Sequence, residues 1–204
     1  PYEVLFTRWL PYGDVLSLKK IEEMVELYYN SAQFTHTLPV LEKVFDNPFQ
    51  LYEKLAAYYE NKGYFINTPA RSYRYHVLLE FALTVDPERE SLYRQLLILD
   101  MYLRENLKSR PEVALNFQEP AEIKEKINDF YKREEKEPLF LQDYVKDGYT
   151  SRQMARMTHI ECFSLPVWEM PFPEMPEISG MPEIPDKEKI YFLLFDYRKR
   201  NPLN

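Results

Sequence analysis

Apolar residues recur every three or four positions over much of residues 14–130, which is the period of an amphipathic helix. The pattern predicts a first helix from Asp14 onward and a second, shorter helix after Thr37. The apolar stripe expected for the first helix consists of Leu18, Ile21, Val25, Tyr28 and Ala32.

Three dipeptides predict further helix starts, because each places a capping side chain directly before a proline. These dipeptides are Asn47-Pro48, Thr68-Pro69 and Asp86-Pro87. An apolar stripe follows each of them, and the first of these helices is expected to stop at Gly63. Another helix is expected to begin near Pro120. The unequal spacing of the starts argues against a regular helical repeat.

The pattern changes after Pro138 and predicts two short helices followed by two strands. Between the strands, residues 165–185 contain six prolines and no basic residue, which is typical of an extended linker. We expect the two strands to pair as a small antiparallel sheet. The expected helices cover residues 139–145 and 150–157, and the expected strands cover residues 158–165 and 189–197.

These elements predict a mainly α fold: an irregular multi-helix bundle with a small C-terminal antiparallel β element. Residues 1–13 are expected to be a leading segment or a linker from an upstream domain. Residues 14–157 are expected to form a helical domain. Residues 158–204 are expected to form a proline-rich linker and a small β-hairpin packed on the helices.

Composition excludes several classes of chemistry. The 204-residue chain has 4 glycines and 1 cysteine, which argues against a Gly-rich phosphate loop, a disulfide framework or a Cys-rich metal site. A net charge of −7 argues against general nucleic-acid binding. We find no signal peptide and no apolar run that would span a bilayer, so we expect a cytoplasmic protein without membrane contact.

Arg71 and Arg74 lie three residues apart near the helix start expected at Thr68-Pro69, followed by Tyr75 and His76. Free backbone N–H groups and two guanidinium groups at a helix start would form a site for an anion or an anionic substrate. The alternative is an ordinary solvated helix face, on which the arginines pair with nearby glutamates.

His159 and Glu161 lie two residues apart on an expected strand, so they share a face, while Cys162 points the other way. The three histidines of the chain lie in separate elements without the spacing of metal ligands. We therefore assign no catalytic residue and no metal site. The favoured interpretation is a structural strand, and an acid–base or metal role for His159 and Glu161 is the alternative.

Several segments resemble one bacterial protein family. They are similar to the domain of unknown function that follows the cobalamin-binding and radical S-adenosylmethionine domains in a group of bacterial proteins. The resemblance extends through nearly the whole chain, and Tyr28-Tyr29-Asn30-Ser31 is its most specific segment. The role of these four residues is unknown, as is that of His159 and Glu161. Further matching segments are Pro1-Tyr2-Glu3-Val4-Leu5, Trp9-Leu10, Glu22-Glu23-Met24-Val25-Glu26, Met157-Thr158-His159-Ile160-Glu161 and Phe195-Asp196-Tyr197-Arg198.

The resemblance implies a longer protein whose upstream domains bind an iron–sulfur cluster, S-adenosylmethionine and cobalamin. We expect this chain to bind none of them, since Cys162 alone cannot supply three cluster thiolates and no D-x-H-x-x-G motif is present. A start at Pro1 rather than Met fits a piece of a longer protein. The expected partner is the upstream radical S-adenosylmethionine domain of the same chain, and a homodimer is also open.

Three functions remain open at this point. The first is a non-catalytic C-terminal accessory domain of a cobalamin-dependent radical S-adenosylmethionine enzyme, which caps the active site or aids substrate or partner binding. The second is a stand-alone helical module for protein interaction or dimerisation. The third, and least favoured, is an independent enzyme that uses His159 and Glu161.

Overall fold

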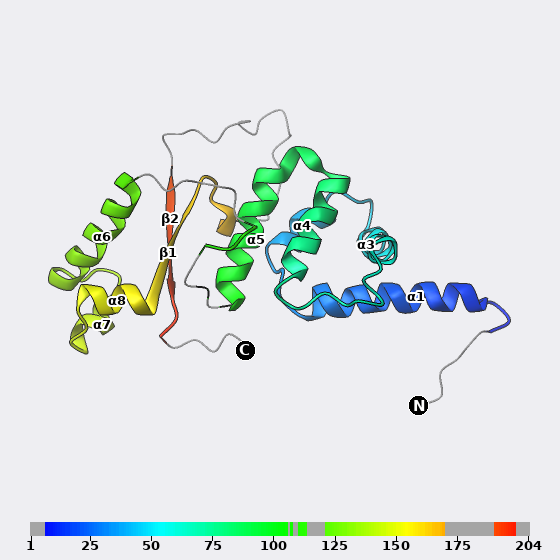
Figure 1. Ribbon diagram of the computed structural model, residues 1–204, viewed down its shortest axis with the longest axis horizontal. Helices are drawn as coiled ribbons and strands as arrows, with labels where there is room; N and C mark the ends of the chain where they lie inside the picture. The colour runs from blue at the N-terminus through cyan, green and yellow to red at the C-terminus, as the bar shows by residue number, and fades with distance from the viewer. Residues whose placement is uncertain (1–6, 106, 108–109, 114–120, 170–189, 199–204) are drawn as a thin grey trace.

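A computed structural model describes residues 7–105, 107, 110–113, 121–169 and 190–198 (Figure 1). Helices dominate these residues, and a two-stranded antiparallel sheet lies near the C-terminus, which confirms the predicted fold class. Within these ranges no helix combines the length and the apolar character needed to cross a membrane.

The elements of the first half are helical. They are α1 (Tyr12–Met24), the π-helix η1 (Val25–Asn30), α2 (Thr37–Glu42), α3 (Pro48–Lys62), α4 (Arg74–Val85), the 3-10 helix η2 (Pro87–Arg89) and α5 (Glu90–Glu105). The second half adds two strands. Its elements are α6 (Ala121–Lys136), α7 (Gln142–Lys146), α8 (Ser151–Met157), β1 (Thr158–Phe163), the 3-10 helix η3 (Val167–Glu169) and β2 (Tyr191–Asp196).

The capping signal at Asn47 is confirmed. Its side-chain oxygen accepts a hydrogen bond from the backbone N–H of Gln50 at 3.1 Å, which satisfies a free donor in the first turn of α3. The same helix ends at Gly63, whose φ of 70° lies in the left-handed region that glycine adopts without strain.

The helix start predicted at Thr68-Pro69 is wrong, because α4 begins at Arg74. Pro69 is buried, and the chain makes a turn before the helix begins. The Ala70 carbonyl accepts the backbone N–H groups of Tyr73 and Arg74 at 2.9 and 3.1 Å, so this turn rather than Thr68 leads into the helix.

The first helix also differs from the prediction. It begins at Tyr12 rather than Asp14, and Leu18 is exposed although the stripe placed it inward. The reason is that only the second half of α1 packs on the body of the protein, while its first turns project away from it (Figure 1). Tyr28, at the far end of the stripe, is fully buried in η1.

The strands pair as predicted, with Thr158 opposite Asp196 and Phe163 opposite Tyr191. The hairpin lies between α5 on one side and α6, α7 and α8 on the other (Figure 1). The larger hydrophobic core continues onto the side facing α5. A smaller cluster on the opposite side consists of Tyr131, Leu141, Tyr144 and Met154, with Ile160 and Leu194 packed against it.

Two buried polar side chains of α5 bind backbone N–H groups of distant segments. The Asp100 carboxylate accepts the N–H groups of His36 and Thr37 at 3.0 and 2.9 Å, at the start of α2. The Gln95 side-chain oxygen accepts the N–H of Ser164 at 2.9 Å, just after β1. Through these contacts, α5 holds the start of α2 and the segment after β1 in place.

Some predicted segments lie wholly or partly outside the described residues. These are residues 1–6 of the leading segment and residues 170–189, which hold most of the proline-rich linker. The helix predicted to begin near Pro120 is confirmed, because α6 begins at Ala121. In the described part of that linker, Trp168 packs edge-on against Phe163 and Tyr191, with ring centroids 6.0 and 5.6 Å apart.

Candidate functional site

Of the two arginines proposed as an anion site, Arg71 lies beside a glutamate of α5. Arg71 Nε is 3.1 Å from the Glu105 carboxylate, and the Tyr75 hydroxyl donates to the same oxygen at 3.0 Å. Burial, followed by the nearby negative charge of Glu105, raises the pKa of Tyr75 above its ordinary value. This hydroxyl therefore remains a neutral donor, and the Glu105 carboxylate already binds the Arg71 cation.

Arg74 points toward buried side chains of the same region. Its Nη1 is 3.5 Å from the side-chain oxygen of Gln33, which is itself buried and donates to the Arg71 carbonyl at 3.3 Å. His76 is not part of this group. Its ring stacks on Tyr73 with centroids 5.5 Å apart. The structure thus brings together Arg71, Arg74 and Tyr75 but not His76.

The Tyr-Tyr-Asn-Ser segment covers the last three residues of the π-helix η1 and the first residue of the turn after it. Tyr28 is buried, and its hydroxyl lies 2.6 Å from the hydroxyl of Tyr59, while Tyr29 is exposed. Asn30 donates to Glu26 at 2.6 Å, and the Ser31 hydroxyl donates to the Tyr28 carbonyl at 3.3 Å. These contacts order the local backbone.

Glu161 is the centre of a buried polar network between β1 and α5. Its exposed fraction is 5%. One carboxylate oxygen accepts the Tyr102 hydroxyl at 2.7 Å, and the other lies 3.0 Å from the Arg110 guanidinium. The Cys162 N–H donates to that second oxygen at 2.9 Å. The carboxylate is thus paired with one cation and bound by two further donors.

His159 lies on the same face of β1 as Glu161, and its ring stacks on Tyr102 with centroids 4.4 Å apart. Its Nε2 is 3.5 Å from Glu161. Burial alone would raise the pKa of the Glu161 carboxyl, but hydrogen bonds from His159 and Tyr102 and the Arg110 charge outweigh it. The pKa therefore lies below its ordinary value, and the group is a weak base at neutral pH.

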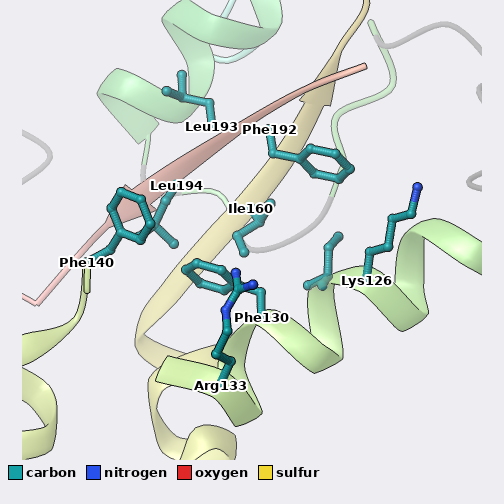
Figure 2. A pocket seen from close by; sticks show the side chains of 9 residues that line it. Lys126, Phe130, Arg133, Phe140, Ile160, Phe192, Leu193 and Leu194 are labelled. Atoms are coloured by element: carbon teal, nitrogen blue, oxygen red, sulfur yellow. The ribbon is translucent and has the colours of Figure 1, made fainter. Parts of the chain in front are cut away.

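The opposite face of the hairpin packs only in part against the smaller cluster and is called the open face below. It forms one wall of a pocket of about 610 Å³, and α6 forms the other (Figure 2). The size falls within the range of small-molecule sites. The lining consists of Lys126, Ile127, Phe130 and Arg133 from α6, Ile160, Phe192, Leu193 and Leu194 from the hairpin, and Phe140 from the loop before α7.

Glu134 holds the loop that carries Phe140. Its carboxylate is buried and accepts the backbone N–H groups of Leu139, Phe140 and Leu141 at 3.0, 2.8 and 2.9 Å. The Phe140 ring lies 6.1 Å from that of Phe130. This rim of the pocket is therefore positioned by a buried charge-assisted contact.

Two cations lie on the pocket side of α6. Lys126 and Arg133 are separated by two helical turns, so both extend from the same side of the helix toward the hairpin (Figure 2). Neither forms an ion pair with another residue that the structure describes.

Sequence reasoning missed this pocket, because its walls come from segments far apart in the chain. The available signal was the apolar pair Ile127 and Phe130 between two cations.

The described ranges contain no group of three or more His, Cys, Asp or Glu side chains arranged to hold a metal ion. The fold and these sites define a mainly helical module in which the buried carboxylates of Asp100, Glu134 and Glu161 are hydrogen-bonded, and in which apolar residues and two cations line a pocket. Residues 1–177 match a protein family of unknown function, DUF4080, and the chain belongs to that family. No curated protein and no solved structure matches the chain.

Proposed function

We propose that the chain is a non-catalytic accessory domain of a cobalamin-dependent radical S-adenosylmethionine enzyme in the cytoplasm, and that it packs against the upstream radical domain. The proposal builds on the resemblance of the Tyr28–Ser31 and His159–Glu161 segments. In that position the domain caps the active site and helps to bind substrate. Any catalytic cofactors, namely the iron–sulfur cluster, S-adenosylmethionine and cobalamin, belong to the upstream domains.

The exposed apolar surface at the beginning of α1 carries this proposal. Trp9 is 83% exposed and Tyr12 is 53% exposed, and Leu16 and Leu18 are exposed as well. Tyr12 and Leu16 lie about one turn apart on the same side of the helix, and neighbouring exposed apolar side chains mark an interaction site. This surface lies on the first described helix, next to the residues through which an upstream domain of the same chain would join.

The buried polar networks support a role without catalysis. Glu161 accepts hydrogen bonds at both oxygens and lies against Arg110, so it has little capacity to take a proton from a substrate. Glu105 is likewise occupied by Arg71 and Tyr75. These carboxylates stabilise contacts between elements, which favours binding over acid–base chemistry.

The test uses the full-length protein with its cluster reconstituted under anaerobic conditions. We compare S-adenosylmethionine cleavage and hydrogen exchange of α1 in the wild type and in a Tyr12→Glu/Leu16→Glu variant. Protection of α1 in the wild type, lost together with most of the cleavage activity in the variant, is the expected result. Leu139→Glu is the matched control, because Leu139 is exposed near α7 at the other end of the molecule. Unchanged protection and cleavage in the double variant would refute the proposal.

The same surface also favours a second candidate, a dimerisation module in which two copies of α1 pack together. The oligomeric state separates the two candidates. A full-length dimer that Tyr12→Glu/Leu16→Glu converts to a monomer, with unchanged cleavage activity, supports dimerisation. A monomer whose cleavage activity depends on α1 supports the accessory domain.

A further inference from the structure

We propose that the pocket between α6 and the open face of the hairpin binds an amphipathic carboxylic acid, with its apolar chain against the hairpin and its carboxylate at Arg133. This binding site is separate from the exposed apolar surface at the beginning of α1. The ligand class follows from three properties of the pocket: its lining, its charge and the exposure of its rim.

The lining defines the apolar part of the ligand. Seven of the nine lining residues are aliphatic or aromatic, and none is acidic. Phe140 and Phe192 at the rim are 66% and 45% exposed. Covering exposed aromatic side chains with an apolar ligand removes their surface from water, which lowers the free energy and favours binding. An alkyl chain is an apolar ligand that fits between the apolar side chains of α6 and those of the hairpin.

The charge defines the head group. Both polar lining residues, Lys126 and Arg133, are cations, in a chain whose net charge is −7. A cationic rim around an apolar pocket selects for an anion and against a neutral or cationic amphiphile. The guanidinium of Arg133 offers parallel donors that match a carboxylate, whereas Lys126 offers a compact charge on a flexible stem. We therefore place the head group at Arg133.

Calorimetric titration of the full 204-residue chain with decanoate, decanol and acetate, below the concentration at which micelles form, tests the proposal. Decanoate is expected to bind saturably with one site and about tenfold more tightly than decanol, which has the chain without the charge. Acetate, which has the charge without the chain, is expected to show no binding in the same range.

The Arg133→Met variant locates the head group. It is expected to lower decanoate affinity about tenfold and to leave decanol affinity unchanged, so that the two ligands bind equally. Lys132→Met is the matched control, since Lys132 is exposed, lies next to Arg133 and pairs with Asp129 at 3.1 Å. It is expected to change neither affinity.

Phe192→Ala locates the alkyl chain. Because Phe192 is partly exposed, the variant is expected to stay folded while losing about tenfold in affinity for both decanoate and decanol. Absence of saturable decanoate binding would overturn the proposal. So would equal decanoate affinity in the wild type and Arg133→Met, or binding that is insensitive to Phe192→Ala.

Discussion

The two faces of the hairpin meet different surroundings. On the closed face, which turns toward α5, Glu161 and His159 contact Tyr102, and Phe195 packs into the larger core. On the open face, which turns toward α6, Ile160 and Phe192 line a pocket. The same two strands therefore present a buried polar network to one neighbour and an accessible apolar surface to the other.

This difference shows how a two-stranded sheet remains stable while one face is open. An isolated hairpin is marginal in water and needs packing on at least one side. The closed face supplies that packing through Phe163, Phe195 and the Glu161 network. On the open face, Phe192 then remains exposed and available for binding.

The largest effect is expected from Glu161→Ala on the closed face. Removing this buried carboxylate breaks its ion pair with Arg110 and its hydrogen bond with Tyr102, and breaking a buried pair in this way costs about 3–5 kcal/mol. Urea unfolding measures the loss. Glu90→Ala is the control, because its pair with Arg94 is half-exposed and is worth about 1 kcal/mol or less. Equal losses of unfolding free energy in the two variants would contradict the conclusion that Glu161 stabilises the closed face.

A matched pair on β2 compares the two faces directly. Phe195→Ala empties a buried position of the larger core and is expected to lower the free energy of unfolding by about 3–4 kcal/mol. Phe192→Ala, three residues earlier on the open face, is expected to lower it by about 1 kcal/mol or less. Thermal unfolding of both variants gives the difference. A comparable loss at Phe192 would mean that the open face also supports the fold.

A smaller effect is expected from Glu134→Ala at the rim of the pocket. Three backbone N–H groups lose a charged acceptor, at a cost of about 2 kcal/mol. The neighbouring exposed Glu137→Ala is expected to stay within about 0.5 kcal/mol of the wild type. Urea unfolding measures both values, and the accessibility of Phe140 to hydroxyl-radical labelling reports whether the rim has moved. Unchanged stability and labelling in Glu134→Ala would contradict this role.

The smallest effect is a pH dependence from Glu161. Because its pKa is lower in the folded protein, its contribution is fully present above the ordinary value of 4.5 and is lost as the pH falls through the folded pKa. The free energy of unfolding is therefore expected to fall more steeply below pH 4.5 in the wild type than in Glu161→Gln. Urea titrations from pH 7 down to pH 3 test this, and parallel slopes would contradict it.

Local patterns predicted the parts of the fold that depend on local contacts. The Asn47 cap and the Gly63 stop depend on residues within a few positions, and both were predicted correctly. The alternation of residues 158–165 and the aromatic run at 189–197 likewise identified the two strands. The apolar stripe predicted that Leu18 is buried, but Leu18 is exposed. In the described structure no other element packs against this part of α1.

Distant contacts determine the features that sequence reasoning missed. The turn before α4 is held by Gln33, which donates to the Arg71 carbonyl across 38 positions, so Thr68 was misread as a cap. The acceptor that binds the start of α2 is Asp100, and nothing near Thr37 points to it. The pocket depends on the distance between α6 and β2. The local sequence of α6 or of β2 alone does not determine that distance.

The position of α5 in the chain bears on synthesis at the ribosome. Asp100 binds the amide of Thr37, 63 positions earlier, while Tyr102 binds Glu161, 59 positions later. A nascent chain therefore cannot secure α2 until α5 has emerged, and α5 then presents a side chain for a strand that is not yet made. Until then α2 lacks this contact and is more accessible to proteases and chaperones, so variants at Asp100 are expected to reduce the yield of folded protein most strongly when translation is slow.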